Sequence, residues 1–248
     1  MKYARVTDSR GFELAPCPED RARELMRSGP ADCVSEDPLT IRLRREINLP
    51  QRAPRASEEP LHGKRVLLHI CCGPCATYTV RRLREVGAEV TGYWFNPNIH
   101  PFSEHEKRRE TVERYGQEIS LPLIIEPAYE MPIFFQLVVG HERFRERCLL
   151  CYQLRLERTA QVAAMHGYDA FTTTLLISPY QDQAAIHRIG DEAGAIHGVA
   201  FYFENLRRGF AEHHQLAREH GLYQQRYCGC LYSEWEAIDR NATTHQRG

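Results

Sequence analysis

Seven of the nine cysteines of this 248-residue chain fall into three short groups, which raises the question of what chemistry such groups can do. Spacings of C-x-x-C and C-x-C let two sulfurs converge on one metal ion or cluster. The pattern therefore predicts thiolate ligands to metal. The three groups are Cys71, Cys72 and Cys75, then Cys148 and Cys151, then Cys228 and Cys230.

The number of clustered cysteines bears on the kind of centre. A single C-x-x-C is compatible with structural zinc, a redox dithiol or an iron–sulfur cluster. One tetrahedral zinc ion or one cubane cluster needs about four ligands, and the clustered cysteines exceed that number. Two adjacent metal centres are therefore predicted. In a reducing compartment such cysteines seldom form disulfides, so we expect none, and the isolated Cys17 and Cys33 are expected to be small buried hydrophobic side chains.

Composition and charge set the broad class of protein. Hydrophobic residues make up 42% of the chain and charged residues 26%, as is ordinary for globular proteins. The formal net charge of -1 gives no overall attraction to nucleic acid or membrane, so a polyanion would need local basic patches. No apolar run approaches the ~20 residues of a membrane span, and the start of the chain lacks the apolar core of a secretion signal. We therefore expect a cytoplasmic protein without membrane contact.

From Lys64 onward the hydrophobic pattern alternates between strands and helices. Such alternation is typical of a parallel sheet with helices on both faces, so residues 64–248 are predicted to form a Rossmann-like (HUP-like) α/β domain. Strands are predicted over residues 65–70, 89–95, 121–125, 169–176 and 201–203. Helices are predicted from the first strand to about residue 87, over 103–120 with Ser103 and Glu106 as a capping box, over 132–165, and over 183–192.

The first part of the chain differs in pattern. Residues 1–47 are predicted to form a small β-rich module, with strands over 3–7, 12–14 and 39–43 and a helix over 18–28. Residues 48–63 are rich in proline and in mixed charges, which is typical of a linker. We place the domain boundary there.

Ligands of open parallel sheets collect at the carboxyl ends of the strands, and several polar residues follow predicted strands directly. Cys71, Cys72 and Cys75 come at the end of the first strand, where helix amides favour thiolate over thiol. Further candidates for ligand binding are Asn96, Asn98, Ser178, Tyr180, Gln181 and Asp182.

Each of these polar residues also has a simpler interpretation. The asparagines commonly satisfy turn backbone, and Asp182 can cap a helix as well as donate a proton. Glu104 and Arg108 lie four residues apart on a predicted helix, where a solvated ion pair is usual. The same pair could instead hold an active-site loop or contact a nucleotide.

Five strings, taken together, resemble the epoxyqueuosine reductases of the QueH type. They occur in the family's order and cover essentially all of residues 64–235. The strings are LLHICCGPCA (67–76), WFNPNIHPFSEHEKR (94–108), RCLLCYQLRLERTA (147–160), FTTTLLISPYQD (171–182) and YCGCLYSE (227–234).

The resemblance implies reduction of the epoxide of epoxyqueuosine, at the wobble base of tRNA, to the cyclopentenediol of queuosine. It implies a 4Fe–4S cluster on Cys71, Cys72, Cys148 and Cys151 and a second, mononuclear iron on Cys75, Cys228 and Cys230. The family can carry aspartate at position 75. Removing the epoxide oxygen as water needs two electrons and two protons, so we expect an external donor of the ferredoxin or flavodoxin type, with the iron acting as Lewis acid.

The string VTDSRGFELAPCPEDRARELMRSGPADCVSEDPLTIRL, within residues 1–47, resembles a PLMP/RRXRR-type module found in nucleic-acid-associated proteins. A role in docking tRNA is the corresponding hypothesis.

Two other functions of the whole chain stay open. A zinc-bound RNA-binding protein without catalysis would use the same thiols. A nucleotide-activating tRNA-modifying enzyme would need a phosphate-binding loop after the first strand, where CCGPCA stands.

Overall fold

The structure is a computed structural model that describes residues 3–7, 9, 13–44 and 61–245 of the chain. The start of the predicted strand at Phe12 and nearly all of the predicted linker lie outside these residues. Two sheets are present, one of four strands and one of five.

The four-stranded sheet confirms a small β-rich module, with strand order β2-β1-β4-β3. Its elements are β1 (Tyr3–Thr7), β2 (Glu13–Pro18), α1 (Glu19–Arg27), β3 (Ala31–Glu36) and β4 (Leu39–Leu43). Two predictions were wrong here. Pro18 ends β2 instead of starting the helix, and β3 was missed because its sequence does not alternate between apolar and polar residues. Cys17 is buried as predicted, but Cys33 on β3 is exposed.

The five-stranded sheet is entirely parallel, with the order β7-β6-β5-β8-β9, and it confirms the predicted α/β class. Its strands are β5 (Arg65–His69), β6 (Glu89–Trp94), β7 (Leu123–Ile125), β8 (Ala170–Thr173) and β9 (Ala200–Phe201). The helices are α2 (Gly73–Glu85), α3 (Phe102–Glu118), α4 (Met131–Val138), α5 (Glu146–Met165), α6 (Gln183–His197), α7 (Phe210–Glu219) and α8 (Leu231–His245), with short 3₁₀ turns η1 (Thr174–Ile177) and η2 (Leu206–Gly209).

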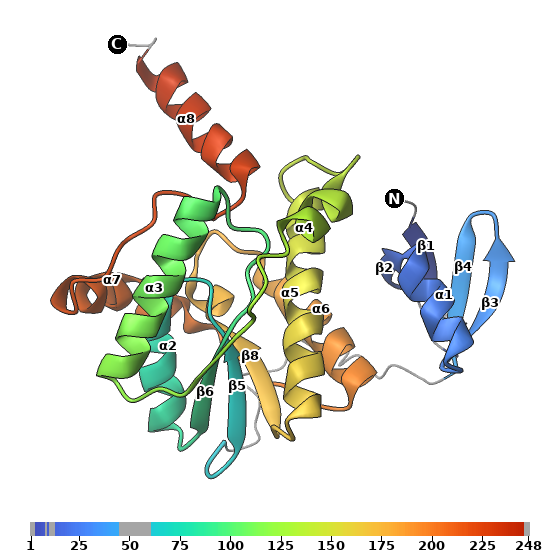
Figure 1. Ribbon diagram of the computed structural model, residues 1–248, viewed down its shortest axis with the longest axis horizontal. Helices are drawn as coiled ribbons and strands as arrows, with labels where there is room; N and C mark the ends of the chain where they lie inside the picture. The colour runs from blue at the N-terminus through green and yellow to red at the C-terminus, as the bar shows by residue number, and fades with distance from the viewer. Residues whose placement is uncertain (1–2, 8, 10–12, 45–60, 246–248) are drawn as a thin grey trace.

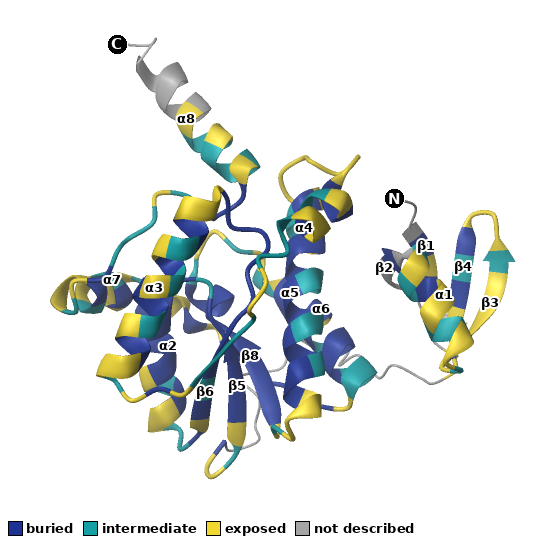
Figure 2. Ribbon diagram, viewed as in Figure 1, coloured by how far each residue is buried: buried dark blue, intermediate teal, exposed yellow. Residues whose placement is uncertain are grey.

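Alternate residues of the central strand β5 build two cores, one on each face of the sheet. Leu67 packs with apolar residues of α5 and α6, whereas Val66 and Leu68 pack with those of α2 and α3. Figure 1 shows these two pairs of helices on either side of the strands, and Figure 2 shows that β5 and β8 are almost wholly buried. The strands are rigidly held, so groups at their ends have fixed positions.

The strand order reverses its direction between β5 and β8. The crossover after β5 runs through α2 to β6 on one side, and the crossover after β8 runs through α6 to β9 on the other. Such a switch point leaves a crevice at the carboxyl ends of the two strands. Cys71 follows β5 and Thr174 follows β8, and the Cys71 backbone N–H donates to Thr174 Oγ1 at 3.2 Å. The first cysteine group therefore lies at the switch point.

Two predicted boundaries were wrong near this edge. The fourth strand was predicted to continue to Leu176, but β8 ends at Thr173, whose hydroxyl accepts from the Leu175 N–H and starts η1. The capping box on Ser103 was also wrong. Helix α3 begins at Phe102 after Pro101, without a side-chain cap, and Glu106 instead pairs with Arg109 at 2.7 Å.

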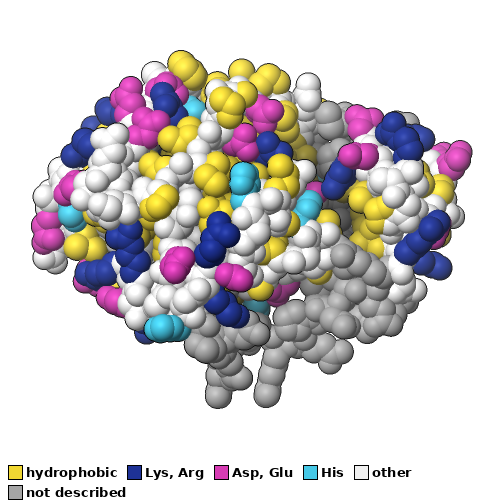
Figure 3. Space-filling model, turned by 60° about the horizontal axis from the view of Figure 1, so that its bottom comes forward, with side chains coloured by type: hydrophobic (Ala, Val, Ile, Leu, Met, Phe, Trp, Pro, Cys, Tyr) yellow, Lys and Arg dark blue, Asp and Glu magenta, His cyan; other side chains and the backbone are white. Residues whose placement is uncertain are grey.

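The surface of the described residues is mixed in character. Figure 3 shows acidic and basic side chains interspersed on one face of the molecule. No helix within the described part of the chain is long and apolar enough to cross a membrane.

Candidate metal centre

The three sulfurs of the first cysteine group lie within 4.8 Å of one another. The turn between β5 and α2 produces this arrangement, because Cys72 caps α2 and its Sγ accepts from the Cys75 N–H at 3.4 Å. Sγ of Cys71 lies 4.0 Å from Sγ of Cys72 and 3.4 Å from the Thr174 hydroxyl. Three soft ligands that converge in this way can hold a thiophilic metal or one side of a cluster.

The second and third cysteine groups lie on α5 and just before α8, and the fold brings them together. Cys151 and Cys230 belong to one small buried cluster with apolar residues of α4 and α5. Burial raises the pKa of the Cys151 thiol to about 12. The Arg155 guanidinium opposes this increase, and the nearby thiols of Cys228, Cys230 and Cys148 add to it. The second and third groups therefore meet in this cluster, through Cys151 and Cys230.

The segment that carries Cys228 links the third group to the first. Cys228 itself is exposed, but Gln225, three residues before it, donates from Nε2 to Cys72 Sγ at 3.1 Å. The segment that carries the third group therefore contacts the first group, and all seven clustered cysteines are free thiols. Cys75 lies with Cys71 and Cys72 in this structure, so its assignment to the second iron stays a prediction.

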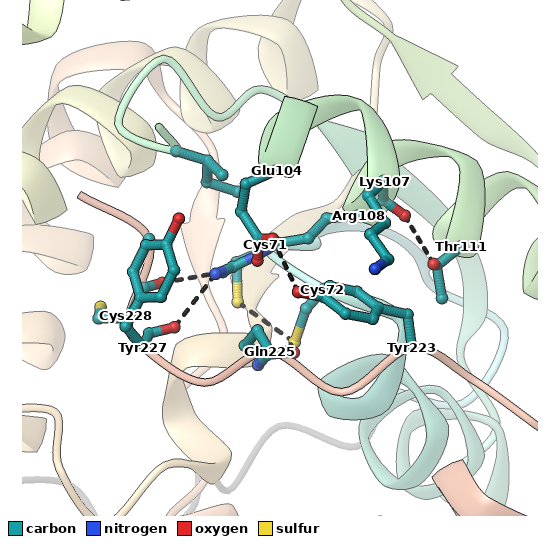
Figure 4. Close-up of polar contacts among 12 residues, drawn as sticks. Cys71, Cys72, Glu104, Lys107, Arg108, Thr111, Tyr223, Gln225, Tyr227 and Cys228 are labelled. Atoms are coloured by element: carbon teal, nitrogen blue, oxygen red, sulfur yellow. Dashed lines mark hydrogen bonds and ion pairs between the residues drawn. The ribbon is translucent and has the colours of Figure 1, made fainter. Parts of the chain in front are cut away.

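Helix α3 holds the chain segment that carries Cys228. Arg108 donates from Nη1 to the Cys228 carbonyl at 3.0 Å and from Nη2 to the Tyr227 carbonyl at 3.1 Å. Its Nε donates to Glu104 at 2.7 Å, and Glu104 in turn accepts from the Tyr223 hydroxyl at 2.7 Å. Figure 4 shows Arg108 reaching from α3 to this segment. Glu104 and Arg108, for which the sequence left open a loop-holding role or a nucleotide contact, are both buried. They hold the loop that carries Cys228.

Gly229 allows this segment to approach α3 and the loop after β6. Its φ is +146°, and a Cβ at this position would lie 3.1 Å from Cγ1 of Ile99. The Gly229 carbonyl accepts from the His100 N–H at 2.8 Å. Glycine is thus required here for both its conformation and its size.

Two asparagines predicted from the sequence lie at the same edge, buried. Asn96 donates from Nδ2 to the Ile70 carbonyl at 2.9 Å and so connects the ends of β6 and β5. The Oδ1 atoms of Asn96 and Asn98 are buried without a hydrogen-bond partner. Buried acceptors without a partner are costly, so these two can accept from a bound polar group.

The loop after η1 carries the remaining predicted residues. Gln181 donates from Nε2 toward Cys228 Sγ at 3.7 Å and accepts from the Tyr152 hydroxyl at 2.8 Å. Asp182 caps α6, accepting from the Ala185 N–H at 3.1 Å. Ser178 accepts from the Tyr180 N–H at 3.2 Å, and the Tyr180 ring is 79% exposed. Of this set, Gln181 lies nearest the thiols and Tyr180 faces solvent.

Sequence reasoning missed several side chains that surround the thiols. Gln225 donates from Nε2 to Cys72 Sγ at 3.1 Å. Arg155 lies buried beside Cys151, Cys228 and Cys71. The spacing of Cys148, Cys151 and Arg155 places all three on one face of a helix, which is a usable signal. For Gln225, which stands in an irregular segment, the sequence offers no such signal.

The donor set fits the metal centres implied by the resemblance. Three soft thiols converge at the switch point, Cys151 and Cys230 share one buried cluster, two amides donate toward sulfur, and a buried guanidinium provides positive charge where thiolates would be negative. The fold and the site define a parallel α/β protein with a thiol-rich centre at the switch point of its sheet.

Comparison with known proteins then identifies the family. Residues 66–236 match the family model described as epoxyqueuosine reductase QueH. The chain is 38% identical over 176 residues to the epoxyqueuosine reductase QueH of Dehalococcoides mccartyi, covering 71% of this chain and 96% of that protein. It is 31% identical to the Haemophilus influenzae protein of the same name over 227 residues, covering 89% and 88%. The chain belongs to this family and is an oxidoreductase.

A solved structure is also similar. It is described as a predicted subunit of tRNA methyltransferase from Methanocaldococcus jannaschii, with a TM-score of 0.45 and 12% identity over 63% of this chain and 75% of that one.

Proposed function

We propose that this protein reduces the epoxide of epoxyqueuosine in tRNA to queuosine, with a 4Fe–4S cluster and an adjacent mononuclear iron. The observation that carries the proposal is the convergence of three sulfurs within 4.8 Å at the switch point, in a chain of the epoxyqueuosine reductase family. Cys71, Cys72, Cys148 and Cys151 would hold the cluster, and Cys75, Cys228 and Cys230 the single iron. When bound, these centres supply the electrons one at a time and a Lewis acid at the reacting oxygen.

The side chains near the thiols would bind and orient the modified base. The buried Oδ1 atoms of Asn96 and Asn98 would accept from hydroxyl groups of the substrate. Gln181, with Ser178 shaping its loop, would contact the nucleotide from the opposite side of the crevice. The exposed ring of Tyr180 offers a flat apolar face, which suits stacking against a base of a single-stranded anticodon loop.

Proton delivery is assigned to Asp182. Its Oδ1 is occupied as the cap of α6, so the proton would be delivered from Oδ2. Glu104 and Arg108 would act on the substrate through the loop they hold, because both are buried and engaged with backbone and tyrosine groups. The electrons would come from a ferredoxin- or flavodoxin-type protein.

The test is anaerobic purification, followed by iron and sulfide quantification and incubation with epoxyqueuosine-containing tRNA and a reductant. We expect a brown protein that contains iron and sulfide and that converts the nucleoside to queuosine. Cys71→Ser should lose both metal and activity, whereas the matched control Cys33→Ser, in the exposed strand β3, should retain both. An iron-loaded protein that leaves epoxyqueuosine unchanged would contradict the proposal. A colourless protein containing zinc would point instead to metal-dependent RNA binding.

A further inference from the structure

Three arginines are buried among the described residues, and one of them differs from the other two in its partners. Arg108 pairs with Glu104 at 2.7 Å, and Arg147 pairs with Glu236 at 2.6 Å. Arg155 is 1% exposed, and within the described ranges no carboxylate lies within ion-pair distance of it. A buried cation without a counterion is expensive, by several kcal/mol, unless a negative group compensates it.

The immediate surroundings of Arg155 identify that negative group. Its Nε donates to the Cys151 carbonyl at 3.2 Å, and its Nη2 is buried without a hydrogen-bond partner. Cys148, Cys151 and Arg155 share one face of α5, and the thiols of Cys151, Cys228 and Cys71, one from each cysteine group, contribute to the electrostatic environment of the guanidinium. Arg155 therefore lies buried beside the thiol-rich centre, with its Nη2 group still available to donate.

Protonated thiols cannot compensate a guanidinium, whereas metal-bound thiolates carry the required negative charge. Addition of one electron to a metal–thiolate centre makes it more negative by one charge, and a nearby fixed cation favours the more negative state. The cation would act through a desolvated environment, since Arg155 and Cys151 are both buried. Its effect should then depend weakly on salt.

We infer that Arg155 is the charge-compensating residue of the metal centre and raises its reduction potential, which makes the centre easier to reduce by a one-electron donor. The inference rests on the proposed function, because it requires that the thiols hold a redox-active metal. Arg155 acts on the metal centre through its charge, and its guanidinium need not touch the substrate.

The test compares the full-length metal-loaded protein with Arg155→Met and Arg155→Lys in a dithionite titration followed by electron paramagnetic resonance. Methionine keeps the length and removes the charge, and lysine keeps the charge. We expect the ratio of reduced to oxidised centre, at a fixed potential, to fall about tenfold in Arg155→Met, which is 59 mV for a one-electron couple. Arg155→Lys should restore most of the reduced fraction that Arg155→Met loses. Arg158→Met, one turn further along α5 and paired with Glu126 at 3.0 Å, is the matched control and should leave the potential unchanged.

Each result decides the question. An unchanged potential in Arg155→Met, or an equal decrease in the lysine variant, would overturn the inference. If Arg155→Met fails to assemble the centre while Arg155→Lys assembles it, the need for positive charge is supported; failure of both would overturn the inference, because the retained charge of lysine would then not be sufficient. Iron and sulfide content of the unsubstituted protein is measured separately. Its absence would refute the proposed cofactors themselves, which distinguishes that failure from a wrong role for Arg155.

Discussion

At the scale of single residues, Asn96 and Asn98 perform different tasks although they lie two positions apart. Asn96 satisfies the Ile70 carbonyl, while Oδ1 of Asn98 is buried and unpartnered. Loss of the first side chain leaves a buried backbone acceptor without its donor. Loss of the second removes an atom that makes no hydrogen bond in the protein. Oδ1 of Asn96 is also unpartnered, so Asn96 combines a structural hydrogen bond with a free acceptor, whereas Asn98 offers the free acceptor without that bond.

Asn96→Ala should lower the free energy of unfolding by about 1–3 kcal/mol, the usual cost of a buried unsatisfied acceptor. Asn98→Ala should change this free energy much less, and should instead raise the KM for the modified tRNA. Denaturant unfolding and steady-state kinetics measure the two effects. Equal destabilisation by both substitutions would contradict the distinction.

The convergence of Cys71, Cys72 and Cys75 could be predicted from the sequence, because their spacing is local and their chemistry is distinctive. The helical spacing of Arg155 from Cys148 and Cys151 places it on the same face of α5, but its burial and the contact of Gln225 could not be predicted. An arginine within a helix usually reaches solvent, and the packing of α5 against the sheet shows that this one is buried. Gln225 reaches Cys72 across 153 positions of the sequence, a contact that no local pattern encodes.

At the scale of elements, the position of the third cysteine group depends on one helix. Arg108→Met removes two hydrogen bonds to the carbonyls of Tyr227 and Cys228. We expect this variant to lose the mononuclear iron more readily than the cluster, seen as faster partial iron release to a chelator. The neighbouring Arg109→Met is the control, because Arg109 pairs with Glu106 and Glu113 on its own helix. Equal rates of iron release in the two variants would exclude a role for the Arg108 contacts.

Gly229→Ala tests the same segment by a different physical effect. The substitution places a Cβ 3.1 Å from Ile99 and requires a φ of +146° that alanine rarely adopts. We expect reduced iron content and lower thermal stability. Gly63→Ala also has a positive φ but meets no atom within 4 Å, so it isolates backbone strain and should keep its iron. Full iron content in Gly229→Ala would show that the segment can shift without loss of ligands.

Element type and order followed from periodicity, whereas some element ends did not. The sequence FTTTLLI consists of apolar and β-branched residues, which favours a strand, yet the Thr173 hydroxyl accepts from the Leu175 N–H and turns the chain into η1. That turn positions Thr174 against Cys71. Side-chain hydrogen bonds of this kind compete with strand pairing, and composition does not show which of the two will form.

At the scale of the whole molecule, the proposed metal centre does not account for the function of the N-terminal module. In the structure, Arg21 of α1 lies 3.7 Å from Glu157 of α5. We expect deletion of residues 1–60 to weaken tRNA binding several-fold while leaving iron content unchanged. Filter binding or fluorescence anisotropy with purified tRNA measures this. Unchanged affinity would remove the tRNA-docking hypothesis for this module.

The seven thiols come from segments that the ribosome produces far apart in time. Gln225, just before the third group, follows Cys72 by 153 residues, so roughly 8–30 s of synthesis separate them at ordinary elongation rates. During that interval the early cysteines are present without their partners, and an iron carrier that arrived then would meet an incomplete set of ligands. For the proposed iron centres, the complete ligand set therefore exists only after the third group has been synthesised, and the first three sulfurs would have to stay reduced until then.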